Sequence, residues 1–439
     1  MATSDHAFTP GVAPEDQALA ARAYSKVFWR LMPFLGLCYI ASYLDRVNIG
    51  FAKLQMSDEL KFSETVFGLG SGIFFLGYFL FEVPSNIFMH RVGARAWIAR
   101  IMITWGLLSG AFIFVKSVPA FYGLRFVLGL AEAGFYPGVI LYLTYWFPAR
   151  LRGQVIAVLM SAIPISSIIG NPLSGWIMDA MNNVGGVSGW KWMFLIEAAP
   201  AVLIGIACLF YLDNSIVAAK WLSADEKRVL AEAIDHDTKT QVGGTHNTKA
   251  AFTDKRVWLM SLIYFCFIMG QYGLTFWLPT LIKTAGVVGN TRIGVISAIP
   301  YIACVIAMNL LGRSADRHRE RRWHLAIPGL IGALGFILAP NAPNVTLAVC
   351  ALSLAAAGAI SCAPLFWALP TSFLAGAGAA AGIAVINSVG NLSGFVAPYL
   401  IGYVKDTTGS AALGMYIIAG CIVVGAGLVL ATPAKMVNR

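Results

Sequence analysis

Charged residues are scarce in this sequence. Asp, Glu, Lys and Arg make up 12% of its 439 residues, against roughly 25% in a soluble globular domain, whereas hydrophobic residues make up 58%. The seven cysteines are odd in number, form no Cys-x-x-Cys motif and fall in apolar stretches, and the six histidines are scattered. These features argue against a disulfide framework and a metal site. They predict a chain that lies mostly in lipid or in a helical bundle.

The sequence also lacks an apolar signal-peptide core and any recognisable catalytic pattern. The first two dozen residues are polar and partly acidic, which indicates a cytoplasmic tail before an uncleaved first helix. The sequence shows no nucleotide-binding loop, metal-ligand cluster or Ser/His/Asp pattern. We therefore predict that the protein is not an enzyme and holds no metal or organic cofactor.

Apolar stretches dominate what is present. A membrane-spanning helix takes about 20 mainly apolar residues, and most stretches of that length here are rich in Gly, Ala and Ser, which let helices pack closely. The predicted fold is an all-α membrane protein with twelve transmembrane helices. The twelve stretches are 28–50, 65–89, 96–115, 119–146, 154–179, 191–212, 257–282, 292–312, 324–340, 345–370, 378–404 and 411–431.

Basic residues are distributed unevenly between the loops. Most of the 31 lysines and arginines lie in alternate loops and near the two chain ends, and basic loops of membrane proteins face the cytoplasm. The distribution predicts a multi-pass protein of the bacterial inner membrane with both termini cytoplasmic. It also accounts for the net charge of +10, so no nucleic-acid partner is needed to explain it.

The longest polar segment, 213–256, separates two sets of six predicted helices and contains a run typical of a surface helix, SADEKRVLAEAIDHD. We predict two six-helix bundles, 28–212 and 257–431, joined by this cytoplasmic linker, with cytoplasmic tails at 1–27 and 432–439. The halves echo each other, because HRVGARAW follows the second helix and GRSADRHRERRW follows the eighth. Matching basic loops at corresponding places are typical of the parallel repeats of transporters.

On these features the chain resembles the major facilitator superfamily over almost its whole length. The loop after the eighth helix keeps the family's D-R-x-x-x-R core as Asp316, Arg317 and Arg321. The resemblance implies that these residues gate the transporter and dock helices against one another, and do not bind substrate. It also implies a monomer.

The loop after the second helix departs from the family pattern. His90 stands where an acidic residue is usual, although Arg91 and Arg95 remain as gating residues. Glu82, one to two turns earlier in the second helix, is a candidate for the missing acidic partner. Glu82 and Glu197 both lie towards the ends of their spans, which favours structural roles for them.

Four ionisable groups lie well inside predicted spans, where each costs roughly 3 kcal/mol on insertion scales and so indicates a function. Asp45 and Arg46 are adjacent in the first helix, so their side chains diverge by about 100°. Arg125 and Glu132 are seven residues apart in the fourth helix, which places them on one face, about 10 Å apart. The alternative is that two acids and two bases merely neutralise one another.

The surroundings of these charges resemble one branch of the superfamily, the anion:cation symporters. The shared motifs are Y-L-D-R-x-N-I-G in the first helix and G-x-x-E-A-G-x-x-P-G in the fourth. The resemblance implies that Arg46 binds a substrate carboxylate and that Tyr43 and Tyr78 form part of the polar wall around it. A guanidinium suits this role, because it grips a carboxylate through two parallel hydrogen bonds and keeps its charge.

The same resemblance implies that Glu132 and Asp45 are proton-coupling acids and that Arg125 lies beside Glu132. Protons would then be the coupling ion of an organic-anion symporter. Moving one negative charge inward against 100 mV costs about 2.3 kcal/mol, which one co-transported proton cancels. If Arg46 or Arg125 turned to the substrate, the acid that it left would be easier to protonate.

The second half offers amides and aromatic rings in place of charges, and these could contact hydroxyl groups or a ring of the substrate. The candidates are Gln271, Tyr272 and Trp277 in the seventh helix, Ser361, Trp367 and Thr371 in the tenth, and Asn387 and Asn391 in the eleventh. The two asparagines lie four residues apart, on one helical face.

The fifth helix bears on the choice of substrate. Sugar-acid carriers of this branch have a glutamine near the position of Ile163, so long polyhydroxy acids are disfavoured. The sequence favours a short hydroxy-diacid such as tartrate, then an aromatic acid such as 4-hydroxyphenylacetate or phthalate. A drug-efflux antiporter shares this fold and remains an alternative, although two arginines in the first half argue against cationic cargo.

Overall fold

The computed structural model describes residues 14–241, 253–370 and 376–434. Within them the chain is almost entirely helical. The helices are α1 (Pro14–Leu60), α2 (Glu64–Val92), α3 (Ala94–Gly110), α4 (Val118–Glu132), α5 (Phe135–Thr144), α6 (Ala149–Met160), α7 (Ala162–Ala180), α8 (Gly189–Tyr211), α9 (Ala224–Gln241), α11 (Lys255–Thr284), α12 (Asn290–His318), α13 (Arg322–Leu338), α14 (Val345–Ala359), α15 (Cys362–Phe366), α16 (Gly376–Asn391), α17 (Ser393–Thr408) and α18 (Ala412–Ala431), with short 3-10 turns at Ala111–Phe114 and Ala339–Asn341.

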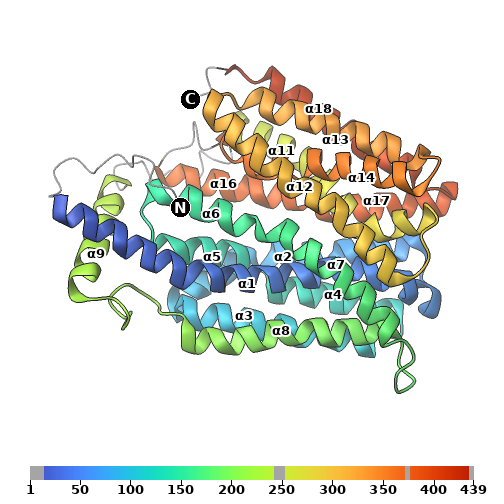
Figure 1. Cartoon of the computed structure of the whole chain (residues 1–439), viewed down its shortest axis with the longest axis horizontal. Helices are drawn as coiled ribbons and strands as arrows, with labels where there is room; N and C mark the ends of the chain where they lie inside the picture. The colour runs from blue at the N-terminus through green and yellow to red at the C-terminus, as the bar shows by residue number, and fades with distance from the viewer. Residues whose placement is uncertain (1–13, 242–252, 371–375, 435–439) are drawn as a thin grey trace.

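Twelve segments of the described chain are long and apolar enough to span a membrane, which confirms the predicted number. The first helix differs most from its predicted bounds, since α1 begins at Pro14, inside the predicted tail, and continues to Leu60. Polar residues extend a helix beyond its apolar part without cost where it leaves the lipid. The starts of α1 and α9 and the end of α18 lie at one end of the bundle, here called the termini end (Figure 1).

Four of the twelve spans are interrupted, and apolar length alone did not reveal this. The fourth span breaks between α4 and α5, where Gly134 adopts φ of 86°, and the fifth breaks at Ser161. The tenth breaks between α14 and α15, and the eleventh breaks at Leu392. The breaks fall in corresponding spans of the two halves, six spans apart. Interrupted helices in membranes are tolerated where they border a cavity, and they mark binding sites in transporters.

Helices α1 to α8 form the N-terminal half and α11 to α18 the C-terminal half (Figure 1). Helix α9 occupies the predicted linker and docks on the N-terminal half, where Lys26 Nζ lies 3.0 Å from Glu226 Oε2. The Ser223 amide, with Lys26, holds the pKa of Glu226 below its usual value. Beside this pair the Trp221 ring stacks on Trp146, with centroids 5.8 Å apart.

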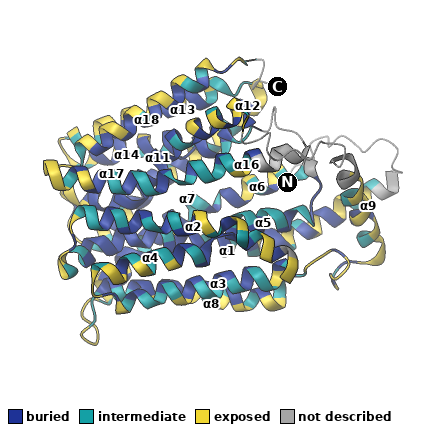
Figure 2. Cartoon of the chain, turned by 180° about the vertical axis from the view of Figure 1, so that it is seen from behind, coloured by how far each residue is buried: buried dark blue, intermediate teal, exposed yellow. Residues whose placement is uncertain are grey.

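Burial follows the pattern expected of a protein in lipid. Figure 2 shows buried residues concentrated between the helices and exposed residues on the outside. Large apolar side chains such as Leu107, Leu203 and Leu310 are exposed on the outer faces of their helices. In water such a surface would be unfavourable over so large an area, whereas a bilayer covers it. The chain is thus a multi-pass membrane protein.

The two halves meet most closely at the far end, opposite the termini end. There α2 packs on α17 and α7 packs on α12 with backbone against backbone. A Cβ added at Gly68 would lie 2.3 Å from the carbonyl oxygen of Pro398, and one at Gly175 would lie 2.3 Å from that of Asn290. Only glycine permits such an approach, so Gly68 and Gly175 allow the two halves to pack backbone against backbone at the far end.

Two aspartates seal this end in a symmetrical way. Asp406, at the end of α17, accepts hydrogen bonds from the backbone amides of Glu64 and Thr65 at the start of α2, at 3.1 and 2.7 Å. Asp179, at the end of α7, accepts from the Thr291 amide at 2.7 Å and from Asn290 Nδ2 at 2.8 Å, at the start of α12. Each half therefore caps a helix of the other with a carboxylate, which the helix dipole favours.

A partly buried ion cluster lies beside these caps. Glu64 forms ion pairs with both Lys53 of α1 and Lys405 of α17, the latter at 2.6 Å. The Lys53 ammonium also sits 3.7 Å from the centroid of the Trp277 ring in α11. Trp277, a predicted wall residue, is therefore part of the far-end closure.

Candidate functional site

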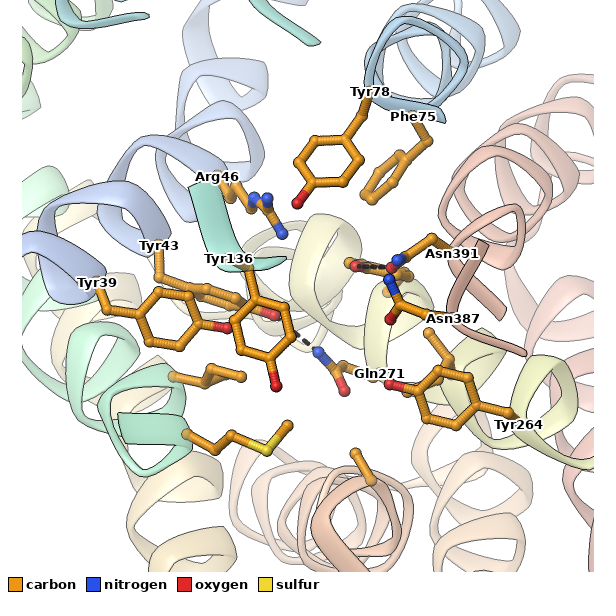
Figure 3. Close-up of a pocket in the computed structure, with 15 residues that line it drawn as sticks. Tyr39, Tyr43, Arg46, Phe75, Tyr78, Tyr136, Tyr264, Gln271, Asn387 and Asn391 are labelled. Atoms are coloured by element: carbon orange, nitrogen blue, oxygen red, sulfur yellow. Dashed lines mark hydrogen bonds between the residues drawn. The ribbon is translucent and has the colours of Figure 1, made fainter. Parts of the chain in front are cut away.

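A cavity lies between the halves near their middle, where the interrupted helices meet (Figure 3). The N-terminal half contributes side chains from α1, α2, α5, α6 and α7, and the C-terminal half contributes α11, α15 and α16. Its lining residues are Tyr39, Tyr43, Arg46, Phe75, Tyr78, Tyr136, Met160, Ile163, Tyr264, Ile268, Gln271, Tyr272, Ala363, Asn387 and Asn391.

Arg46 is the charged residue of the cavity lining, and the structure pairs it with Glu132. Arg46 Nε donates to Glu132 Oε1 at 2.7 Å and a terminal nitrogen lies 2.5 Å from the same oxygen. The Ser42 hydroxyl donates to that oxygen as well, at 3.0 Å. Glu132 is 1% exposed and Arg46 is the more accessible partner. The guanidinium is therefore held at the edge of the cavity by an acid behind it.

Aromatic rings surround this guanidinium. Its carbon lies 5.6 Å from the centroid of the Tyr43 ring and 5.4 Å from those of Phe74 and Tyr78. Rings at this distance attract a cation through their electron-rich faces. They also keep water and lipid away from the charge, which strengthens its attraction for an anion in the cavity.

Two hydrogen bonds cross between the halves at the cavity. Gln271 Nε2 donates to the Tyr43 hydroxyl at 2.7 Å (Figure 3). Asn387 Nδ2 donates to Glu82 Oε1 at 3.1 Å. Glu82, for which the sequence favours a structural role, therefore contacts the other half directly. A third bond, from the Tyr272 hydroxyl to Asn391 Oδ1 at 3.1 Å, orients the wall within the C-terminal half.

Several residues proposed for the site lie away from the cavity lining. Asp45 faces α3, where it accepts hydrogen bonds from Trp105 Nε1 at 2.8 Å and the Ser109 hydroxyl at 2.9 Å. Arg125 donates to the carbonyl oxygens of Gly70 and Ser71, at 3.2 and 3.1 Å, so it ties α4 to α2.

Trp367 is another of these residues. Its ring packs on Tyr264, with centroids 5.0 Å apart, so it supports a lining residue from behind. Ser361, at the break of the tenth span, donates to the carbonyl oxygen of Ala357. Thr371 falls outside the described residues.

The predicted gating residues lie at helix ends that border two short loops at the termini end. Asp316, near the end of α12, and Arg321, directly before α13, form an ion pair at 2.8 Å. Arg317 belongs to the last turn of α12. The Arg95 amide donates to Asn214 Oδ1 at 3.0 Å, so this loop contacts the linker, and Arg91 is exposed.

Several lining residues were not foreseen, above all Tyr39, Tyr136 and Tyr264. Tyr39 lies one turn from Tyr43 on α1, and the rings of Tyr39 and Tyr136 stack with centroids 5.6 Å apart. Helical spacing from Arg46 could have indicated Tyr39. Tyr136 follows the break at Gly134, so only knowledge of that break would have placed it.

The arrangement suits a small organic anion. One guanidinium supplies the positive charge, while tyrosine hydroxyls and the amides of Gln271, Asn387 and Asn391 supply neutral hydrogen-bonding groups. Met160, Ile163, Ile268 and Ala363 add an apolar patch. Among the described residues no group of three or more His, Cys, Asp or Glu side chains is placed to hold a metal ion.

A bundle of twelve membrane-spanning helices in two halves around a polar central cavity defines a membrane transporter. The chain belongs to the Major Facilitator Superfamily, whose profile matches residues 35–398. It is 50% identical over 409 residues to a protein of Agrobacterium vitis that carries the name tartrate transporter, a match that covers 93% of this chain and 94% of that one. This agrees with the predicted anion:cation symporter branch.

Two further comparisons define the range of the similarity. A protein of Acinetobacter baumannii named quinolone resistance transporter is 41% identical over 407 residues, which covers 92% of this chain and 93% of that one. A solved structure of the xylose transporter XylE from E. coli superposes with a TM-score of 0.72 at 15% identity, covering 92% of this chain and 99% of XylE. The latter confirms the predicted fold.

Proposed function

We propose that the protein is a proton-coupled symporter that imports a small organic carboxylate, with a tartrate-like hydroxy-diacid as the first choice. The observation that carries this proposal is the Arg46–Glu132 pair at the cavity edge. A cation that lines the cavity and is balanced by a buried acid can exchange that acid for an anion of the substrate. Both termini would be cytoplasmic, and the protein would work as a monomer.

The exchange gives a coupling mechanism. A substrate carboxylate approaches Arg46 from the cavity and takes over the guanidinium contacts that Glu132 Oε1 now makes. Glu132, buried and deprived of its cation, then accepts a proton from water, because an isolated carboxylate is costly in a low-dielectric site. With a monoanion bound, Arg46, protonated Glu132 and the substrate together carry the same net charge as the empty Arg46–Glu132 pair. A dianion needs a second proton for the same balance. Release of the substrate on the other side reverses both steps.

The cavity wall supports a hydroxylated acid. The amides of Gln271, Asn387 and Asn391 face Arg46 across the cavity (Figure 3), at a place where substrate hydroxyls would meet them. The relative that carries the name tartrate transporter favours the same choice. The second choice is an aromatic acid, for which Tyr39, Tyr136 and Tyr264 offer stacking faces. Ile163 lines the cavity, which again disfavours long sugar acids.

Drug efflux is the alternative from a different class, and the relative named quinolone resistance transporter is the observation that favours it. The two functions predict different ligands. A thermal-shift screen of the purified protein with tartrate, phthalate, 4-hydroxyphenylacetate, gluconate and a quinolone would separate them. Stabilisation by the quinolone and by none of the simple acids would favour efflux.

The coupling proposal is tested with Glu132→Gln in proteoliposomes. Wild-type protein should accumulate labelled tartrate under an inward proton gradient. Glu132→Gln should lose gradient-driven accumulation and keep exchange of internal for external substrate, because the amide cannot carry a proton yet leaves Arg46 in place. Glu232→Gln, an exposed acid on α9, is the matched control and should behave as wild type. Normal accumulation by Glu132→Gln would refute the proton role.

A further inference from the structure

A second group of buried polar side chains lies on the side of α1 that faces away from the cavity. It consists of Asp45 and Asn48 on α1, Trp105 and Ser109 on α3, Ser174 on α7 and Glu197 on α8, and we call it the four-helix cluster. Its carboxyl groups are almost completely buried, with Asp45 3% and Glu197 2% exposed.

Small residues bring the four helices together around this cluster. A Cβ at Gly106 of α3 would lie 3.2 Å from the carbonyl oxygen of Ala198 on α8, next to Glu197. On the other side, a Cβ at Gly170 of α7, one turn before Ser174, would lie 3.5 Å from Leu44, next to Asp45. The close packing leaves no path for bulk water to solvate the carboxyl groups.

The cluster holds two acids and no base. Among the described residues, no Lys, Arg or His forms an ion pair with either Asp45 or Glu197, because the neighbouring Arg46 points about 100° away around α1 and pairs with Glu132. The other charged group that acts on Asp45 is Glu132, itself an acid. Two unpaired carboxylates in such a site would each cost several kcal/mol to bury, so one of them must be neutral.

Hydrogen bonds indicate which one is neutral. Asp45 accepts from the Trp105 indole N–H, which can only donate, from the Ser109 hydroxyl and, at 3.4 Å, from Asn48 Nδ2. Both Asp45 oxygens therefore have donors, as a carboxylate requires. Glu197 Oε1 accepts from Ser174 at 2.6 Å.

Two acceptor atoms of the cluster are left without a donor. They are Glu197 Oε2 and Asn48 Oδ1, both buried. Asn48 also lies within hydrogen-bonding reach of Glu197. A proton placed on Glu197 Oε2 would turn this atom into a donor, and Asn48 Oδ1 is an acceptor without a donor, on a residue within its reach.

We propose that the four-helix cluster is a proton-binding site in which Glu197 holds the proton and donates it as a hydrogen bond to Asn48 Oδ1. Asn48 in turn donates to the Asp45 carboxylate, so one amide connects the neutral acid to the charged one. The site is separate from the Arg46–Glu132 pair, and its existence does not depend on the identity of the cargo or on the proposed coupling at Glu132.

Infrared spectroscopy of the purified protein in lipid tests the assignment. The wild-type spectrum at neutral pH should contain a carbonyl-stretch component of a protonated carboxylic acid that Glu197→Gln removes. Glu132→Gln, which alters an acid paired with Arg46, is the control and should retain this component. An unchanged protonated-acid region in Glu197→Gln would overturn the proposal.

Thermal stability supplies a second readout. In Glu197→Gln the introduced side-chain amide N–H can replace the acid O–H towards Asn48, so Tm should stay close to that of wild type, whereas Glu197→Leu should lower it. In the infrared experiment, Asn48→Leu should shift the frequency of the protonated-acid carbonyl stretch without removing it. This variant keeps the proposal testable if the Glu197 variants fold poorly. Equal losses of Tm in Glu197→Gln and Glu197→Leu would contradict the hydrogen-bond assignment.

Sodium binding is the alternative to proton binding. If Tm is higher in sodium than in choline, and Glu197→Gln abolishes this difference, the cluster binds sodium instead of a proton.

Discussion

The two halves of this transporter differ at the cavity and match at the far end. The N-terminal half carries ionisable side chains at and behind the cavity wall, among them Arg46, Glu132 and Arg125, whereas the C-terminal half presents Gln271, Tyr272, Asn387 and Asn391 to the same cavity. At the far end, in contrast, Asp179 of one half and Asp406 of the other make equivalent contacts with helix starts across the interface.

Under the proposed function, the difference separates two tasks. Binding an anion and handling protons need few groups and can be concentrated in one half. Opening and closing an interface between two halves that rock against each other needs contacts on both sides of the symmetry axis. The helix breaks also recur in corresponding spans of both halves. The two halves therefore share the backbone features that shape the cavity but differ in the side chains that line it.

Removing the positive charge of the N-terminal wall should have the largest effect. Arg46→Ala takes away the only guanidinium lining the described cavity and leaves Glu132 buried without a partner, a change that costs about 3–5 kcal/mol for buried ion pairs. We expect carboxylate binding, measured by calorimetry, to weaken roughly 100-fold or more. Arg46→Lys keeps the charge but not the paired geometry and should retain only part of the affinity.

A double variant separates binding from stability in this experiment. Arg46→Ala with Glu132→Gln removes both charges, so Tm should recover towards the wild-type value while binding stays weak. Wild-type affinity in Arg46→Ala would show that the charge asymmetry between the halves has no part in anion recognition.

Altering the C-terminal wall should have a smaller and more selective effect. Asn391→Leu removes an amide that faces the cavity and accepts from Tyr272, a change worth about 1 kcal/mol, or roughly fivefold in affinity. The loss should appear with tartrate and not with succinate, which lacks its two hydroxyl groups. Trp367→Phe, which alters a ring packed on Tyr264, is the control. Equal losses of affinity for tartrate and succinate in Asn391→Leu would mean that this wall does not recognise substrate hydroxyl groups.

The far-end caps should show the smallest single effects and the closest agreement between halves. Asp179→Asn and Asp406→Asn each remove a carboxylate from a helix start, which is worth about 0.3–1 kcal/mol and shifts the population of the closed far end up to about fivefold. Distances between spin labels at Val184 and Val288, in far-end loops of different halves, would report the opening. A large change of the label distance in one variant and none in the other would contradict the proposed equivalence of the two caps.

Much of the fold could be predicted from the sequence. Apolar length defined twelve spans because lipid forces every backbone group of a span into a helix. The internal repeat followed from the loops at Arg91 and Arg317. The breaks at Gly134 and Ser161 could not be read from hydropathy, because an interruption of one or two residues leaves the apolar stretch intact.

The site was predictable in part and for a definite reason. A buried charge is costly wherever it lies, so its mere presence singled out Asp45, Arg46, Arg125 and Glu132. Spacing along one helix also brought Asn387 and Asn391 to one wall. It could not show that Tyr136 and Tyr264 line the same cavity, because they come from helices far apart in the chain.

The sequence by itself determined that this protein spans a membrane twelve times in two related halves and that it buries charge near the middle of the first half. Only the tertiary structure decided which partner each charge takes. Arg46 meets Glu132 and the cavity, its neighbour Asp45 meets Trp105 and Ser109 on the other side, and Arg125 meets backbone carbonyls. Adjacent side chains on a helix point about 100° apart, so their roles depend on which helices pack on each face.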